Sequence, residues 1–422
     1  MPDIEVVRPE CICVLGLGYV GLPMAAMFAV NGFRVVGVDP RADVVEAVNA
    51  GEVPIEEVGL KTVVQAAVNS GSLRARREPE PADAFVIAVP TPIRPDHTAD
   101  LSYVARAARA IVPHLRRGNL VVLESTVPPR TTEGLLVPIL AESGLRARGD
   151  FSVAYCPERI LPGRTLAELV ENDRVVGGID PPSAERAAAL YRGIAEGEVF
   201  CTSAIVAELV KLVENASRDV GIAFANEVVR IARRFGADGG EVIALANRHP
   251  RVNILRPGPG VGGHCIPVDP WFLVEASPEE ARLIHAARQV NDSQPVWVAA
   301  RVLAALEGVP DPKVSLWGVA YKADVDDARE TPALPVIEAL EAAGMQVSPL
   351  DFHVKRFARP LADLESSVAG ADCILLLTDH REFHFFEPEA IGQRMRRRLL
   401  FDTRNSLPRD RWEKAGFEVV GL

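Results

Sequence analysis

The glycine-rich stretch "VLGLGYVGLPMA" constrains the fold of this chain more than any other part of the sequence. Gly16, Gly18 and Gly21 stand in the spacing GxGxxG, after an apolar run of strand length and at the start of a helix predicted over 19–31. In a strand–turn–helix unit these glycines allow a tight turn, close approach of a pyrophosphate to backbone N–H groups, and close packing of helix on strand. The context therefore predicts a dinucleotide-binding unit rather than a structural turn alone.

The strand predicted next, "FRVVGVD", ends on an acid. Asp39 lies 21 residues after Gly18. An acid at this position accepts hydrogen bonds from ribose hydroxyls and repels a 2′-phosphate, so the sequence favours NAD over NADP. Arg41 is close enough in sequence to keep NADP open.

Apolar runs of strand length alternate with helical patterns up to about residue 200 and again from Lys313. Continuous Val, Ile and Leu runs separated by helices are typical of a parallel sheet covered on both faces. Between these parts, 203–235 shows one long helical pattern with Ser203 and Gly236 as its expected caps. We predict an α/β fold: two Rossmann-like doubly wound domains joined by a long central helix and a helical region, which is a candidate subunit interface.

Composition excludes several classes of protein. The chain carries 57 acidic and 46 basic residues, a net charge of −11, which argues against a nucleic-acid partner. No apolar run approaches the roughly 18 residues of a membrane span, and the N-terminus lacks the pattern of a secretory signal. The six cysteines form no CxxC pair and no disulfide-like spacing. We therefore expect reduced thiols and a cytoplasmic protein without a membrane partner.

The segment "RPGPGVGGHCIPVDPWF" surrounds Cys265 with glycine and proline. Either the cysteine is a small apolar side chain in a tight turn, or the glycines clear space around a reactive sulfur. The following residues could begin a helix, and a thiol at a helix N-terminus has a lowered pKa. His264 beside Cys265 is not a metal ligand set, so no metal is expected. The nucleophile is the favoured interpretation.

Other candidates come from position. Lys211 and Asn215 stand four residues apart and share one face of the long predicted helix. Thr126 and Glu158 come just after predicted strands, where open α/β sheets place their ligands. Lys322 and Arg329 follow the first strand of the second α/β part. This part lacks GxGxxG, and the two basic side chains suit a phosphate-bearing ligand. For each of these residues a non-functional interpretation stays open, such as a lysine that extends its ammonium to solvent or a charged surface loop.

Taken together, the chain resembles the nucleotide-sugar 6-dehydrogenases of the UDP-glucose/UDP-N-acetylmannosamine dehydrogenase family. The similar motifs run in family order over nearly the whole chain: "GLGYVGLP", "VPTP", "ESTVPPRTT", "CPER", "AELVKLVENASRD", "GVGGHCIPVDP" and "GVAYKADVDDARETP". The resemblance implies an NAD-binding Rossmann domain over 1–202, a central helical dimerisation region over 203–308 and a UDP-binding α/β domain over 309–422. It also implies a homodimer through the central helices.

Within the family, the cysteine loop resembles most the branch that acts on UDP-N-acetyl-D-mannosamine, and next the UDP-N-acetylglucosamine branch. UDP-glucose enzymes typically have GGSCFPKD, whereas here His264 precedes the cysteine and Val268 replaces the lysine. The implied reaction is the NAD-dependent four-electron oxidation of the sugar C6 alcohol to a carboxylate. It passes through a thiohemiacetal and a thioester on Cys265.

The resemblance also implies the role of each site residue. Lys211 and Asn215 would stabilise oxyanions, Asp269 and Thr126 would hold the hydrolytic water, and Glu158 would assist hydrolysis. The implied NAD-binding residues are Gly16, Gly18, Tyr19, Val20, Gly21, Asp39, Thr91, Thr126 and Arg329. The implied substrate-binding residues are Arg159, Ile160, Lys211, Asn215, Arg218, His249, Arg251, Gly262, Tyr321 and Lys322.

Two positions depart from the family pattern. Pro162 stands where the UDP-glucose branch has a second glutamate, and Val44 where a basic residue is common. The rival interpretations are a dehydrogenase of UDP-N-acetylglucosamine or UDP-glucose, an NAD-retaining UDP-sugar epimerase, a hydroxyacid-type dehydrogenase and a non-catalytic binding protein. An epimerase would release no NADH and would need no thiol, which makes Cys265 the discriminating residue.

Overall fold

The structure, a computed structural model, describes residues 9–55, 57–160 and 163–422, so Pro162 lies outside the described residues. The chain divides into two compact units, unit 1 (Met1–Glu214) and unit 2 (Asn215–Leu422), and each is described by itself. The boundary falls inside one continuous helix of 31 residues, α8 (Ala204–Arg234). This helix agrees with the one predicted over 203–235.

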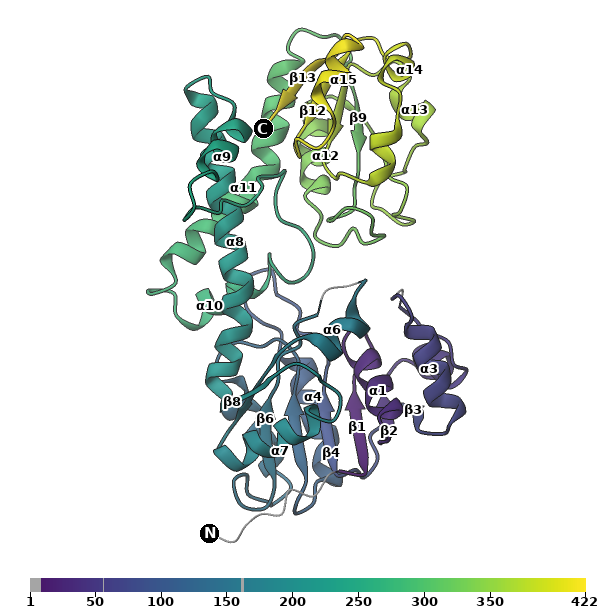
Figure 1. Cartoon of the computed structure of the whole chain (residues 1–422), viewed down its shortest axis with the longest axis vertical. Coiled ribbons are helices and arrows are strands. Elements are labelled where there is room, and N and C mark those ends of the chain that lie inside the picture. Colours follow the sequence, from purple (N-terminus) through teal and green to yellow (C-terminus); the bar gives the residue numbers. More distant parts are fainter. Residues whose placement is uncertain (1–8, 56, 161–162) are drawn as a thin grey trace. The chain divides into compact units, whose positions relative to one another are not determined.

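Unit 1 is built on an eight-stranded sheet in the order β3-β2-β1-β4-β5-β6-β7-β8 (Figure 1). Neighbouring strands are parallel except β6 and β7, which are antiparallel. The strands are β1 (Cys11–Leu15), β2 (Arg34–Val38), β3 (Leu73–Arg76), β4 (Ala84–Ile87), β5 (Leu120–Leu123), β6 (Ser152–Tyr155), β7 (Arg174–Gly178) and β8 (Val199–Ser203). Sequence patterns predicted these strands except β3, whose alternation of Leu and Ala with arginine gives a weaker signal.

Side chains of this sheet pack into two apolar cores, one on each face. Val14 and Val86 belong to one core, and the adjacent Leu15 and Ile87 to the other. Successive residues of a strand point to opposite faces, so a sheet covered on both sides needs apolar residues throughout. The first face is covered by α1 (Gly21–Val30), α2 (Ala42–Asn49), α3 (Leu60–Asn69), α6 (Thr165–Glu171) and α7 (Pro181–Tyr191). The second is covered by α4 (Ser102–Ile111), α5 (Val137–Ala141) and the start of α8.

Unit 2 contains a five-stranded sheet in the order β10-β9-β11-β12-β13, in which all neighbouring strands are parallel. The strands are β9 (Lys313–Trp317), β10 (Gln346–Leu350), β11 (Cys373–Leu376), β12 (Leu399–Asp402) and β13 (Glu418–Gly421). Here too the two faces carry separate cores, with Leu316 and Leu375 in one and Trp317 and Leu376 in the other.

The helices of unit 2 include two long ones joined by buried polar contacts. The second of them, beside α8, is α11 (Arg282–Ala305). Its buried Arg288 donates to Asp219 of α8 at 2.5 Å, and Asn291 donates to the same carboxylate at 2.8 Å. The other helices are α9 (Gly239–Ala246), α10 (Asp269–Ala276), α12 (Ala333–Ala342), α13 (Leu364–Val368), α14 (Pro388–Gly392) and α15 (Arg409–Lys414).

The predicted α/β class is confirmed: along the chain, one doubly wound sheet precedes the long helix and a second follows it. Among the residues that the structure describes, no helix combines the length and the apolar character needed to cross a membrane.

Candidate active site

The GxGxxG turn joins β1 to α1, and its three glycines meet different surroundings. A Cβ on Gly16, at φ +97°, would lie 2.5 Å from the Ala88 carbonyl oxygen, and one on Gly21 would lie 1.9 Å from that of Gly16. A Cβ on the exposed Gly18 would meet nothing within 4 Å. Gly16 and Gly21 are therefore required by the turn itself. Gly18 leaves backbone open to a ligand, as the pyrophosphate of a dinucleotide requires.

Asp39 lies at the end of β2, beside this turn. Its carboxylate accepts from the backbone N–H of Leu17 at 3.2 Å and from that of Arg41 at 3.0 Å. Arg41 in turn bonds Asp43 at 2.7 Å. The acid is thereby fixed at the mouth of the turn, which is the position that ribose hydroxyls need.

Further predicted residues follow the carboxyl ends of β4, β5 and β6, which are neighbours in the sheet. The Thr91 hydroxyl donates to the Thr126 carbonyl at 2.6 Å. The Lys211 ammonium of α8 donates to the Glu158 carbonyl at 2.8 Å. The structure thus joins Thr91 to Thr126 and Lys211 to Glu158, at the sheet edge where ligands bind in open α/β folds. Tyr19 and Val20 precede α1 beside the glycine turn.

Glu158 belongs to a buried polar cluster that the sequence did not reveal. Its carboxylate accepts from the Arg159 backbone N–H at 2.7 Å and pairs with Arg174 at 3.5 Å. Glu124, just after β5, accepts from the Tyr191 hydroxyl at 2.6 Å. Burial, reinforced by the charge of Glu158, raises the pKa of Glu124 to about 8. The Glu124 carboxyl therefore favours its protonated form at neutral pH, near the carboxylate of Glu158.

Two predicted substrate residues adjoin this cluster. The Arg159 guanidinium pairs with Glu214 of α8 at 2.7 Å and donates to the Asp173 carbonyl at 3.1 Å, and the half-buried Ile160 follows it.

In unit 2, the glycines around Cys265 are explained by their neighbours. A Cβ on Gly262 would lie 2.8 Å from the Glu330 carbonyl oxygen and from Tyr321 Cβ, and one on Gly263, at φ +86°, would lie 3.0 Å from the Tyr321 ring. A Cβ on Gly260 would lie 3.0 Å from Pro295. Glycine is required here because the loop presses against Tyr321 and its neighbours.

Cys265 is half-buried at the end of this loop. Nδ1 of His264 lies 3.2 Å from its sulfur, within hydrogen-bonding distance. The helix expected after the cysteine is α10, which begins at Asp269, and the carbonyl of Cys265 accepts from the N–H of Asp269 at 2.8 Å. The Asp269 carboxylate accepts from the Asn215 amide of α8 at 2.6 Å. Hydrogen bonds therefore link Cys265, Asp269 and Asn215 to one another.

The remaining predicted residues of unit 2 differ in their contacts. Tyr321 is half-buried against the cysteine loop, whereas Lys322 is exposed. Arg329 binds Asp327 at 2.6 Å, and its carbonyl accepts from the Gly263 N–H at 3.2 Å. Three further residues, Arg218, His249 and Arg251, are exposed, and His249 Nδ1 accepts from the Arg251 backbone N–H at 3.4 Å.

One cluster of possible metal ligands occurs among the described residues. Asp324, His353 and His380 offer ligand atoms within 4.8 Å of one another. They come from three loops after different strands, an arrangement that sequence spacing could not indicate.

Comparison with known proteins assigns the class. Residues 10–195, 205–293 and 315–409 match the NAD binding, central and UDP binding domains of the UDP-glucose/GDP-mannose dehydrogenase family. The chain belongs to this family and is an NAD-dependent oxidoreductase, so the predicted family and cofactor are confirmed. The open backbone at Gly18 and the fixed Asp39 fit NAD.

Several relatives are similar along nearly their whole length. UDP-N-acetyl-D-mannosamine dehydrogenase of Methanococcus maripaludis strain C7 is 46% identical over 97% of this chain and 96% of the relative. NDP-N-acetyl-D-galactosaminuronic acid dehydrogenase of Ralstonia nicotianae is 46% identical over 93% of this chain and 95% of the relative. A solved structure of UDP-D-ManNAc dehydrogenase from Pyrococcus horikoshii has a TM-score of 0.90 and 40% identity, covering 98% and 99% of the two chains.

Proposed function

We propose that this enzyme oxidises UDP-N-acetyl-D-mannosamine at C6 to UDP-N-acetyl-D-mannosaminuronate, using two NAD⁺ per substrate. The observation that carries the proposal is the Cys265 thiol beside His264, on a loop tied through Asp269 to Asn215. A dehydrogenase that stops at an aldehyde or ketone does not need such a thiol. The names of the relatives from Methanococcus maripaludis and Pyrococcus horikoshii support the choice of sugar.

The chemistry assigns a step to the cysteine. NAD⁺, which the glycine turn and Asp39 would hold, would supply the hydride acceptor for two successive oxidations at C6. Between them the Cys265 sulfur adds to the aldehyde carbon and forms a thiohemiacetal, so the second oxidation yields a thioester. Water adds to the thioester carbonyl, and its collapse releases the carboxylate and returns the thiol. His264, 3.2 Å from the sulfur, is placed to exchange the thiol proton.

The other side chains stabilise charge or hold water in this proposal. Lys211 and Asn215 stabilise the oxyanions at C6, and Lys211 is also a candidate proton acceptor. Asp269 and Thr126 hold the hydrolytic water, and Glu158 assists its attack. Among the substrate-binding residues, Tyr321 and Lys322 take the nucleotide. Arg159, Ile160, Arg218, His249, Arg251 and Gly262 make the remaining contacts.

The test counts NADH released per sugar nucleotide consumed. The panel is UDP-ManNAc, UDP-GlcNAc, UDP-glucose and, because of the Ralstonia nicotianae relative, UDP-GalNAc. We expect two NADH with UDP-ManNAc and much slower turnover with the other three. Cys265→Ala should form no acid while retaining NAD binding. One NADH per substrate, or steady acid production by Cys265→Ala, would overturn the nucleophile. If the enzyme prefers a different sugar, only the assignment of the substrate changes, and the role of Cys265 stands.

We further propose a homodimer through the central helices. Phe224 and Ile231 of α8 and Phe235, directly after it, expose 55%, 52% and 80% of their surface and recur at helical spacing. A second copy of the chain is the natural occupant, because isologous contacts suit one apolar stripe. Phe224→Glu should yield monomer in size-exclusion chromatography with light scattering. Val58→Glu, at a more exposed valine of unit 1, should stay dimeric.

We also place the enzyme in the cytoplasm. All six cysteines are free thiols, and the proposed chemistry requires that Cys265 stays reduced. Localisation of a tagged full-length chain by cell fractionation tests this.

A further inference from the structure

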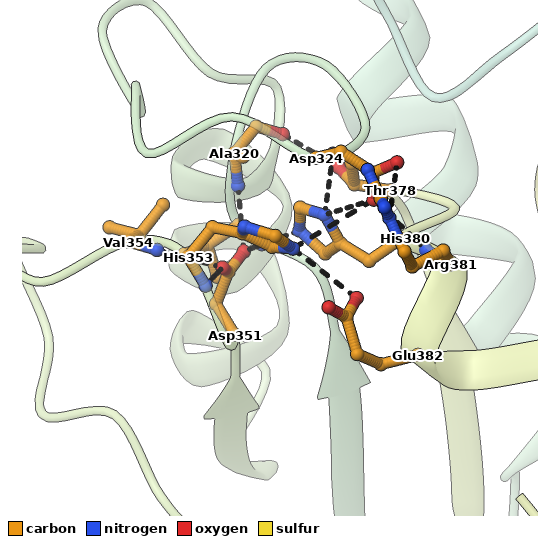
Figure 2. A network of polar contacts seen from close by, with 10 residues as sticks. Ala320, Asp324, Asp351, His353, Val354, Thr378, His380, Arg381 and Glu382 are labelled. Carbon is orange, nitrogen blue, oxygen red and sulfur yellow. Dashed lines mark hydrogen bonds and ion pairs between the residues drawn. The ribbon is translucent and has the colours of Figure 1, made fainter. Parts of the chain in front are cut away.

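The loop that follows β9 carries Tyr321 and Lys322. Three buried side chains bond to Ala320 and Asp324, on either side of these two residues (Figure 2). They are Asp351 at the end of β10, and Thr378 and His380 after β11. We propose that these three are positioning residues, which fix the Tyr321–Lys322 segment for recognition of the uridine diphosphate group. This inference rests on the proposed function, because it takes these two residues to bind the nucleotide.

Asp351 fixes the start of the loop. One carboxylate oxygen accepts from the backbone N–H groups of Val319 at 2.7 Å and Ala320 at 3.0 Å. The other accepts from the N–H groups of His353 and Val354, both at 2.9 Å. A single buried side chain thus ties the loop after β9 to the loop after β10. Since the carboxylate is fully buried, these bonds must replace its hydration.

His380 fixes the end of the same segment. Its Nδ1 accepts from the Asp324 N–H at 2.9 Å, and its Nε2 lies 2.9 Å from the Asp351 carboxylate. Because Nδ1 accepts, the proton of the neutral ring lies on Nε2 and is donated to Asp351. The fully buried imidazole therefore bridges Asp351 and the backbone at Asp324.

Thr378 completes the set. Its hydroxyl donates to the Ala320 carbonyl at 2.6 Å. Directly before the loop, a Cβ on Gly318, at φ +84°, would lie 2.5 Å from Thr378 Cβ. The backbone is therefore held at Val319 and Ala320 before the two ligand residues and at Asp324 after them. Fixing a loop in its binding conformation removes the cost of ordering it on binding.

The cluster of Asp324, His353 and His380 does not form a good cation site. His380 already uses one nitrogen as acceptor and the other as donor. The Asp324 carboxylate accepts from Arg381 at 3.1 Å, and His353 lies 3.2 Å from Glu382. A metal would have to displace the Asp324 N–H from Nδ1 and compete with a guanidinium.

The held segment also reaches the cysteine loop. Tyr321 lies against Gly262 and Gly263, and its own N–H donates to the Asp327 carbonyl at 3.0 Å. If the segment is no longer fixed, nucleotide binding should therefore weaken most, and kcat should fall by a smaller factor.

The experiment compares His380→Leu, which removes donor and acceptor, with His380→Gln, whose amide can supply both. Thr378→Val and Thr378→Ser form a second, milder pair. Glu382→Gln is the control, because Glu382 contacts His353 in the same cluster and, among the described residues, its carboxylate forms no hydrogen bond with the backbone of the loop after β9. For each full-length variant we would measure the Kd of UDP and of NAD⁺ by calorimetry, and hydrogen exchange at the amides of Val319, Ala320 and Asp324.

We expect at least tenfold weaker UDP binding and faster exchange in His380→Leu, smaller losses in Thr378→Val, and near recovery in His380→Gln and Thr378→Ser. NAD⁺ affinity should stay within twofold, which a general loss of folding would not allow. UDP affinity unchanged in both His380→Leu and Thr378→Val would overturn the inference. A wild-type chain that binds no UDP would overturn the proposed nucleotide site itself.

Discussion

The Asn215 amide donates a 2.6 Å hydrogen bond to the carboxylate of Asp269, and so joins α8 to the first turn of α10. Both side chains are more than nine-tenths buried. The backbone N–H of Asp269 also bonds the Cys265 carbonyl at 2.8 Å. The orientation of the acid is therefore coupled to the loop that carries the thiol. The Asn215 amide and the Cys265 loop together hold the Asp269 carboxylate in one orientation.

Substituting Asp269 should separate the oxidations from hydrolysis. In Asp269→Asn the thioester should form, because Cys265 is intact, but the water that releases it is no longer held. We expect a burst of NADH followed by a steady rate lower by about 10²–10⁴, the usual contribution of general acid–base groups. Intact-protein mass spectrometry of the quenched enzyme should show a covalent sugar-nucleotide adduct.

The exposed Glu279→Gln, just beyond α10, is the matched control, since it makes the same change of charge without touching the site. A variant of Asp269 that turns over at the wild-type rate, or that loses the burst as well as the steady rate, would contradict this role.

The glycines beside the thiol lead to a second prediction. Gly263→Ala should reduce activity strongly, because the new Cβ meets both a positive φ and the Tyr321 ring at 3.0 Å. Gly308→Ala is the control, because Gly308 has a similar φ of +80° but open space around its Cα. Both variants should lose about 1–2 kcal/mol of stability from the left-handed backbone. Only Gly263→Ala should also lower kcat by tenfold or more in steady-state assays, and equal kcat values would exclude the packing explanation.

How much of this could be predicted from sequence depended on whether the signal was local. The GxGxxG turn, the long helix and most strands were predicted because each is encoded in contiguous residues, and β3 was missed because its outward-facing positions are arginines. The pair Lys211 and Asn215 was predicted from its spacing. The contact between Asn215 and Asp269 could not be predicted, because 54 residues separate them and only the fold brings them together.

Buried polar partners were the largest omission. Glu124 is two residues from the predicted Thr126, and two signals could have drawn attention to it: its position after β5 and its place at the start of the motif "ESTVPPRTT". Arg174 and Tyr191 carry no motif, yet one pairs with Glu158 and the other bonds Glu124. Likewise, Asp351, Thr378 and His380 act through backbone N–H and C=O groups of a distant loop.

The three glycines of the dinucleotide turn should respond differently to alanine. Gly18→Ala should leave the stability of unit 1 nearly unchanged, because its Cβ would enter open space, but should weaken NAD⁺ binding at least tenfold by blocking the pyrophosphate. Gly16→Ala should destabilise the fold by about 1–3 kcal/mol, because of its φ of +97° and the clash with Ala88. Thermal melts and NAD⁺ titrations of the two variants separate these effects. Normal NAD⁺ affinity in Gly18→Ala would place the cofactor elsewhere.

The raised pKa of Glu124 predicts how stability depends on pH. Burial and the nearby charge of Glu158 raise this pKa from 4.5 to about 8. Between these values the folded chain holds a proton that the unfolded chain releases, so stability is greatest below about pH 4.5 and falls as pH rises towards 8. The slope is about 1.4 kcal/mol per pH unit. Glu124→Gln keeps the side-chain shape and an oxygen that accepts from Tyr191. It cannot ionise, so the slope should disappear.

From pH 5.5 to 7.5 the wild type should therefore lose about 2.7 kcal/mol relative to Glu124→Gln, equivalent to a shift of roughly 5–10 °C in Tm for a unit of this size. Differential scanning calorimetry at both pH values measures this, and the transition of unit 1 is identified by its rise with added NAD⁺. Glu142→Gln, at an exposed carboxylate of the same unit, should track the wild type. Parallel pH responses of wild type and Glu124→Gln would mean that Glu124 is ionised in the folded chain. The Arg174 guanidinium would then have to balance the charges of both Glu124 and Glu158.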